Sequence, residues 1–278
     1  MGSVLALLAA AGFGISDVTG AVAARRLSAL TVTLGIQVTG LLVLLPALLL
    51  LPGEVAPRAL ATGAVAGVFG TVGLVLYLRA MATGPIGVIS PVAALVGAAV
   101  PVGWGIVLVG DDVGGLQLLG ILLGLAAVVA VASGPGGGDR RAGARTATAA
   151  AVSGAAFGLF FVALDASPAD SGLWPVLGSR LTAIGLLTAT VIVRGRPLVP
   201  VGSGRLVLIS GIGDVTGNVL FLLATRIGLL SLVSLLTSLY PVVALLVARW
   251  WLQERLTGVQ ATGVVAALLA TGLLVGGG

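Results

Sequence analysis

Residues 228–250 read GLLSLVSLLTSLYPVVALLVARW, a stretch of 23 residues that carries a single charge, Arg249. An α-helix needs about 20 mostly apolar residues to cross the hydrocarbon core of a bilayer, so this stretch predicts a membrane-spanning helix. Stretches of similar length and apolarity recur along the chain, and we expect nine further spans at residues 3–22, 29–51, 60–80, 85–108, 114–133, 147–165, 173–193, 205–225 and 257–276. The sequence therefore predicts an all-α integral membrane protein with ten transmembrane helices.

The composition of the chain agrees with a lipid environment. Of the 278 residues, 58% are hydrophobic and only 8% are charged, whereas about a quarter of the residues of a soluble domain are charged. Every basic residue is an arginine, and most lie between the apolar stretches. This pattern is typical of membrane topology and argues against nucleic-acid binding. We expect a multi-pass protein of a cell membrane of the bacterial type.

Cysteine and histidine are both absent from the sequence. Disulfides, thiolate catalysis, cysteine or histidine zinc sites and histidine proton relays are therefore excluded. We expect no metal, no cofactor and no catalytic residue. The opening residues, MGSVLALLAAAGFG, lack the basic region of a signal peptide, so they predict a first membrane helix.

The chain repeats itself at a spacing of 143 to 144 residues. At 144, Phe13-Gly14 aligns with Phe157-Gly158, and at 143, Gln117 aligns with Gln260, a rare residue here. The ten predicted spans also agree at this spacing. We expect a first five-helix repeat over 1–134, a flexible basic linker over 135–146 and a second repeat over 147–278. Because five is odd, the second repeat enters the membrane from the opposite side, which is the inverted-repeat arrangement common among secondary transporters.

The second repeat carries a family resemblance. The stretch SLYPVV at residues 238–243, LQERLT at residues 252–257, and then Gln260 and Gly263 resemble the closing signature of EamA-type permeases of the drug/metabolite transporter superfamily. The first-half counterpart is residues 80–131. This resemblance implies ten helices in two repeats, with spans 1, 3, 4, 6, 8 and 9 around a central cavity and spans 5 and 10 outside it. It implies transport of a small metabolite such as an amino acid, sugar or nucleotide sugar, in many members outward. The chain departs from the family around Phe13-Gly14, where a tryptophan is often found early in the first helix.

Polar residues inside the spans are candidate site residues, because ionisable groups at membrane depth are costly and normally face an interior or wet cavity. In span 8, intervals of four, four and three place one set of residues on one helix face: Ser210, Asp214, Asn218 and Phe221. In span 9, Ser231, Ser234, Ser238 and Pro241 form a similar face, and Pro241 frees a backbone carbonyl. Asp17 and Arg180 are the other deep charges.

Each candidate also has a structural interpretation. Asp214 and Asn218 suit a substrate ammonium, a hydroxyl or a proton, or a hydrogen bond between helices. The serines suit a ligand or a bond to their own helix. Arg180 suits a carboxylate or phosphate ligand, or a structural ion pair. Site residues are predicted as Asp214, Asn218, Ser210, Phe221, Ser234, Ser238, Asp17 and Arg180.

The sequence favours a permease for a small polar metabolite, and the family resemblance implies the outward direction of many members. Its rival is an intramembrane enzyme or lipid carrier that uses Asp214 and Asp17 as acids. Without histidine, proton coupling requires a buried carboxylate, again Asp214 or Asp17. Arginines concentrate in the odd-numbered loops, which predicts that both termini lie outside the cell, whereas the family resemblance implies cytoplasmic termini.

Overall fold

The computed structural model describes residues 1–83, 86–111, 113–132, 140–195, 202–252 and 258–276. In this part of the chain the regular elements are all helices. They are α1 (Gly2–Ala24), α2 (Ala29–Leu50), α3 (Pro57–Thr83), α4 (Ile86–Trp104), α5 (Gly115–Ala132), α6 (Arg140–Asp165), α7 (Trp174–Val193), α8 (Gly204–Thr225), α9 (Leu230–Thr237), α10 (Tyr240–Leu252) and α11 (Gly258–Gly276), with a π-helix at Gly105–Val109 and a 3₁₀ turn at Ala169–Ser171.

Eight helical segments in the described residues are long and apolar enough to cross a membrane. They are Gly2–Ala24, Ala29–Leu50, Pro57–Thr83, Val92–Val109, Thr148–Asp165, Trp174–Val193, Gly204–Thr225 and Leu230–Trp251. Each matches one predicted span closely. The other two predicted spans, 114–133 and 257–276, correspond to the helices α5 and α11. The all-helical, multi-pass membrane class is therefore confirmed.

The span predicted over 228–250 is not one continuous helix. It consists of α9 and α10, which are separated between Thr237 and Tyr240. Pro241 has no N–H to donate to the Thr237 carbonyl, so the regular α-helical ladder cannot continue through this point. Shorter bonds replace it: the Leu239 N–H donates to Leu236 O at 3.2 Å, and the Val242 N–H donates to Leu239 O at 2.9 Å.

The second half of the linker predicted over 135–146 belongs to a helix. Helix α6 begins at Arg140, so residues 140–146 are helical. Arginine and alanine are good helix formers, and these two residue types dominate the start of α6. Residues 133–139, and residues 253–257 of the signature stretch, lie outside the described residues.

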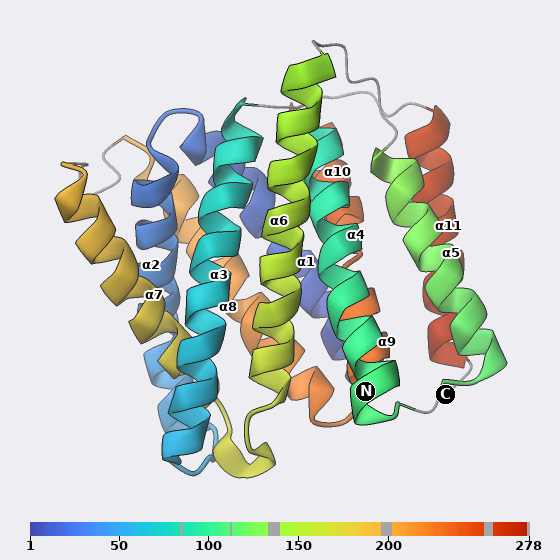
Figure 1. The fold of residues 1–278 in the computed structure, drawn as a ribbon, viewed down its shortest axis with the longest axis horizontal. Coiled ribbons are helices and arrows are strands. Elements are labelled where there is room, and N and C mark those ends of the chain that lie inside the picture. Colours follow the sequence, from blue (N-terminus) through green and yellow to red (C-terminus); the bar gives the residue numbers. More distant parts are fainter. Residues whose placement is uncertain (84–85, 112, 133–139, 196–201, 253–257, 277–278) are drawn as a thin grey trace.

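The helices form one bundle, with a different pair of helices at each of its two sides (Figure 1). Helices α5 and α11 pack on each other at one side, whereas α2 and α7 lie at the other. Between them, α1 packs on α8, and α3 and α4 pack on α6. Small residues allow this close approach. A Cβ on Gly12 of α1 would lie only 2.8 Å from the Gly213 carbonyl oxygen of α8, so glycine is needed at this crossing.

Candidate functional site

A cavity lies in the middle of the bundle, at the level where α9 gives way to α10. Its lining comes from α1 to α4, from α6 to α8, from Ser238 at the helix break and from Tyr240 of α10. No lining residue in the described part of the chain comes from α5 or α11. The atom-free space measures about 780 Å³, counting the part open to solvent.

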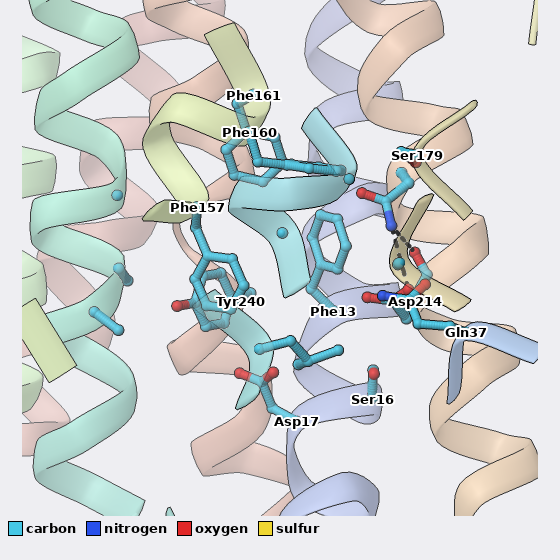
Figure 2. Close-up of a pocket in the computed structure, with 18 of the residues that line it drawn as sticks. Phe13, Ser16, Asp17, Gln37, Phe157, Phe160, Phe161, Ser179, Asp214 and Tyr240 are labelled. Atoms are coloured by element: carbon cyan, nitrogen blue, oxygen red, sulfur yellow. Dashed lines mark hydrogen bonds between the residues drawn. The ribbon is translucent and has the colours of Figure 1, made fainter. Parts of the chain in front are cut away.

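Arg180 of α7 is the centre of a polar cluster in the cavity wall, and two members of this cluster, Asp214 and Gln37, lie next to each other in Figure 2. Its side chain is 2% exposed, and its Nη2 lies 2.6 Å from Oδ2 of Asp214 on α8. Its Nη1 donates to Oε1 of Gln37 on α2. The Asn218 amide, one turn along α8, donates to the same Asp214 oxygen at 3.3 Å. Three helices therefore position the guanidinium, and Asp214 balances its charge.

Space for the guanidinium depends on a glycine. A Cβ on Gly40 of α2 would lie 2.9 Å from Nη1 of Arg180 and 3.0 Å from its Cζ. The guanidinium therefore lies directly over the α2 backbone. The Nε of Arg180 is buried and has no hydrogen-bond partner among the described residues.

Asp17 of α1 forms a second, separate polar group in the cavity. Its Oδ2 accepts a hydrogen bond from the Tyr77 hydroxyl at 2.5 Å and a long one from Ser90 Oγ at 3.5 Å. Both donors are neutral. Within the described residues, no arginine forms an ion pair with Asp17. Asp17 therefore differs from Asp214, whose charge is matched by Arg180.

Aromatic rings supply much of the remaining wall. The rings of Phe160 and Phe161 lie 5.4 Å apart, and the Phe13 ring lies 6.0 Å from Phe161 and 6.5 Å from Tyr240. Figure 2 shows the Phe160–Phe161 pair and Asp17 at opposite ends of the view. The cavity thus combines an apolar wall with a few convergent polar groups, the arrangement typical of small-molecule sites.

The structure brings together five of the eight site residues predicted from the sequence. Those in the cavity lining are Asp17, Arg180, Asp214, Asn218 and Ser238.

The other three predicted site residues lie outside the cavity lining. Ser210 donates to the Ser16 carbonyl at 2.8 Å, because α1 packs directly on α8 at that level. Phe221 is fully buried, 4.3 Å from the Phe161 ring between centroids. Ser234 lies inside α9, where its carbonyl accepts a hydrogen bond from Ser238 Oγ at 2.6 Å. The structure therefore places these three outside the cavity lining, and their role in a site stays a prediction.

Several lining residues escape the sequence analysis. Gln37 is an amide inside an apolar span. Like Asn218, it is a polar side chain at membrane depth and therefore a candidate site residue. The motif FGLFF at residues 157–161 supplies three of the aromatic lining residues. Tyr77 is not part of the cavity lining, but it donates a hydrogen bond to Asp17 and also lies within a predicted span. A search for every polar or aromatic residue at membrane depth would have found all of them.

Comparison with known proteins identifies the family. The sequence model of the EamA-like transporter family matches residues 1–133 and again residues 144–276. The chain belongs to the EamA-like transporter family. The resemblance carried by residues 238–263 is thus confirmed. EamA-like proteins are membrane transporters rather than enzymes.

The EamA-like fold is also present in a solved structure. One, described as "Crystal structure of protein", shares 20% sequence identity and superposes with a TM-score of 0.71, over 96% of this chain and 98% of the other. At that identity the likeness concerns the fold alone. No curated protein matches the sequence.

Proposed function

We propose that this EamA-like transporter is a secondary transporter that exports a small polar metabolite, such as an amino acid, across the cell membrane. The observation that carries the proposal is the buried Arg180–Asp214 pair in the wall of a cavity between membrane helices. Charged groups at this depth are costly, and they are typical of substrate pathways. The proposed binding residues are Asp17, Arg180, Asp214, Asn218 and Ser238.

We propose that transport occurs by alternating access between two inverted repeats of five helices. In this proposal α5 and α11 also cross the membrane, which brings the total to ten spans. The family model matches each half of the chain separately. Contacts between the halves also come in exchanged pairs. A Cβ on Gly217 would meet the Phe13 ring at 2.6 Å, and a Cβ on Gly73 would meet the Phe157 ring at 2.9 Å. Both pairs are related by the 144-residue spacing of the sequence repeat.

Further support for an even number of crossings comes from the ends of the chain. Helix α1 begins and α11 ends at the same end of the bundle (Figure 1). In an inverted repeat, the two halves rock about a site near the membrane midplane, so that the site opens to each side in turn. The cavity, which both halves line, is that site.

A proteoliposome experiment tests the proposed function. Purified protein is reconstituted, and counterflow of radiolabelled solutes is measured with amino acids, sugars and nucleotides as candidates. Counterflow that requires the protein supports the permease. Chemical conversion of a lipid or solute by the detergent-solubilised protein, without counterflow, would instead support the intramembrane enzyme.

We propose that transport is coupled to the movement of protons and that Asp17 is the group that carries the proton. Asp214 is already engaged by Arg180, whereas Asp17 has only neutral partners among the described residues. We expect reconstituted wild-type flux to respond to an imposed pH gradient, measured with a pH-sensitive dye and labelled solute together. If solute flux does not change with the pH gradient while Asp17 and Asp214 are intact, the protein is a facilitator.

Both termini are proposed to lie outside the cell, because arginines in short loops favour the cytoplasmic side. The even-numbered loops carry only Arg58 and Arg226. Arg226 has a structural role of its own, since it donates to the Ser167 carbonyl at 3.0 Å. The test is a reporter that is active only outside the cell, fused after Gly278. We expect this fusion to be active. Activity of a reporter that requires the cytoplasm would reverse the orientation.

A further inference from the structure

We propose that the end of the bundle opposite to the chain termini binds the headgroups of anionic phospholipids. The residues that bind them are five exposed arginines, here called the arginine surface: Arg25, Arg26, Arg79, Arg194 and Arg205. Their partner is the lipid leaflet around this end of the protein, so the surface is separate from the cavity and its solute. With the termini outside the cell, as proposed above, this leaflet is the cytoplasmic one, which carries anionic lipids.

Four helices converge beneath the arginine surface, at Gly20 of α1. A Cβ on Gly20 would lie 2.9 Å from Ser210 Oγ of α8 and 3.3 Å from Leu78 Cδ2 of α3. The same Cβ would lie 3.6 Å from Ile36 Cδ1 of α2. The ends of these helices just beyond Gly20 are therefore neighbours.

Three of the arginines lie close to this convergence. Arg25 is five residues beyond it along α1, and Arg205 is five residues before it in α8. Helix α8 runs antiparallel to α1, since a Cβ on Gly2 would lie 3.4 Å from Ala224 O at the other end of the pair. At a rise of 1.5 Å per residue, Arg25 and Arg205 both lie about 7.5 Å beyond the convergence. Arg79 is the residue directly after the contact in α3.

The other two arginines extend the surface around the start of α2. Arg26 lies in the loop before α2, where its N–H donates to Ala23 O at 3.0 Å. Arg194 follows the end of α7, and Val191 in the last turn of α7 packs in one buried cluster with Leu30 of α2. Helix α2 also packs on α3 and α8. The five arginines therefore form one continuous group of helix ends.

The arginine surface has no acid among the described residues to balance it. The described ion pair joins Arg180 to Asp214 in the cavity. The described acids outside the cavity lie at the opposite end of the bundle, at Glu54, Asp111, Asp165 and Asp170. In the sequence, only Asp139 and Glu254 fall in the loops of the arginine end. Like charges repel one another across such a surface, and anions held against it reduce that repulsion.

The start of α8 adds a second attraction for anions. The N-terminus of a helix carries a partial positive charge, so an arginine in the first turn is unfavourable on its own account. Arg205 lies in that turn, and the N-cap residue Ser203 makes no side-chain hydrogen bond to it. A phosphate at this point would offset both the helix dipole and the guanidinium charge.

Exposed tryptophans mark the level of the lipid headgroups at the same end. Trp250 and Trp251, near the end of α10, are 86% and 46% exposed. In Figure 1, α10 lies above α9 and so leads away from the end that carries the termini. Tryptophans of membrane proteins concentrate at the headgroup level. Because the arginines are spread over several helix ends at this level, they suit the separate headgroups of a lipid layer better than one small anion.

The test measures which lipid the full-length protein retains. Protein held on an affinity resin is equilibrated with micelles that contain equal amounts of phosphatidylglycerol and phosphatidylcholine with identical acyl chains, and the bound lipid is counted by mass spectrometry. Each arginine near an anionic surface contributes roughly a fivefold gain in binding, so we expect at least about a tenfold preference for phosphatidylglycerol. The preference should shrink several-fold at about 1 M salt, where the Debye length falls to about 3 Å.

Charge variants identify the surface. In Arg25→Gln/Arg26→Gln/Arg205→Gln, we expect the two lipids to bind within about twofold of each other, because three of the five charges are gone. The corresponding triple lysine variant should keep most of the preference, because it keeps the charge. Arg58→Gln is the matched control, since Arg58 is exposed at the start of α3, at the opposite end of the bundle. Thermal unfolding without added lipid should be alike for all four proteins, since the replaced side chains are exposed.

Several results would overturn the proposal. Equal binding of the two lipids to the wild type needs no variant and would do so, and so would a triple glutamine variant with the wild-type preference. A triple lysine variant without the preference would show that charge is not its cause. Displacement of the lipid by inorganic phosphate at matched ionic strength would assign the surface to a free anion instead. Because lipid binding is measured without solute, none of these results decides whether the protein is a transporter.

Discussion

Asp214→Asn is expected to lower solute counterflow by at least about a hundredfold, because it leaves the Arg180 guanidinium buried without its counter-charge. The ion pair measures 2.6 Å, and the Arg180 side chain is 2% exposed. Removing one partner of a buried pair costs about 3–5 kcal/mol, since the other charge stays buried and unpaired. The guanidinium then turns toward other acceptors and leaves its position beside Asp214. A two-kcal/mol loss already corresponds to roughly a thirtyfold change in binding.

The double variant Arg180→Gln/Asp214→Asn separates folding from transport. Removing both charges together restores much of the thermal stability, because no unpaired charge remains. Transport of the wild-type solute stays low, because the cation proposed to bind it is gone. Thermal unfolding in detergent and counterflow in proteoliposomes measure the two effects on the same preparations. Wild-type flux in Asp214→Asn would show that the acid has a packing role only.

Much of the fold is predictable from the sequence because lipid imposes a simple requirement. Every backbone polar group in hydrocarbon must be satisfied within the protein, so each span is a helix of about 20 residues. The spans at 29–51 and 205–225 are therefore found within one residue of α2 (Ala29–Leu50) and α8 (Gly204–Thr225). The break between α9 and α10 is harder to predict. Pro241 signals it, but many membrane helices accommodate a proline without ending.

The charged residues of the site are also predictable, whereas their partners are not. Asp17, Arg180 and Asp214 stand out because each is ionisable within an apolar stretch. Which acid pairs with Arg180 depends on how α7 and α8 are rotated and packed, and helical periodicity contains no information on that. Gln37 enters the cluster from α2, a span that the family resemblance does not name among those around the cavity.

Position along a helix face explains the predicted residues that lie elsewhere. Ser210, Asp214 and Phe221 share one face of α8, yet each meets a different neighbour. Ser210 meets α1, Asp214 meets Arg180 of α7, and Phe221 meets Phe161 of α6. A face that extends over several turns contacts several neighbouring helices, and only part of it lines the cavity. Periodicity identifies the face, and tertiary packing selects the turn.

Gly63→Ala is expected to have the largest effect on folding of any single methyl addition in α3. A Cβ at this position would overlap the Pro175 carbonyl oxygen of α7 and would lie 2.9 Å from its carbonyl carbon and 3.0 Å from its Cα. These are backbone atoms, so no side chain can rotate away, and the two helices must move apart. Overpacking costs about 1–3 kcal/mol when side chains absorb it, and we expect a cost at or above the upper end here. The matched control is Gly185→Ala in α7, where a Cβ meets no atom within 4 Å. Thermal unfolding and monodispersity in detergent measure the difference: Gly185→Ala should melt with the wild type, and Gly63→Ala well below it. Equal melting temperatures for the two variants would mean that α3 and α7 do not approach through Gly63.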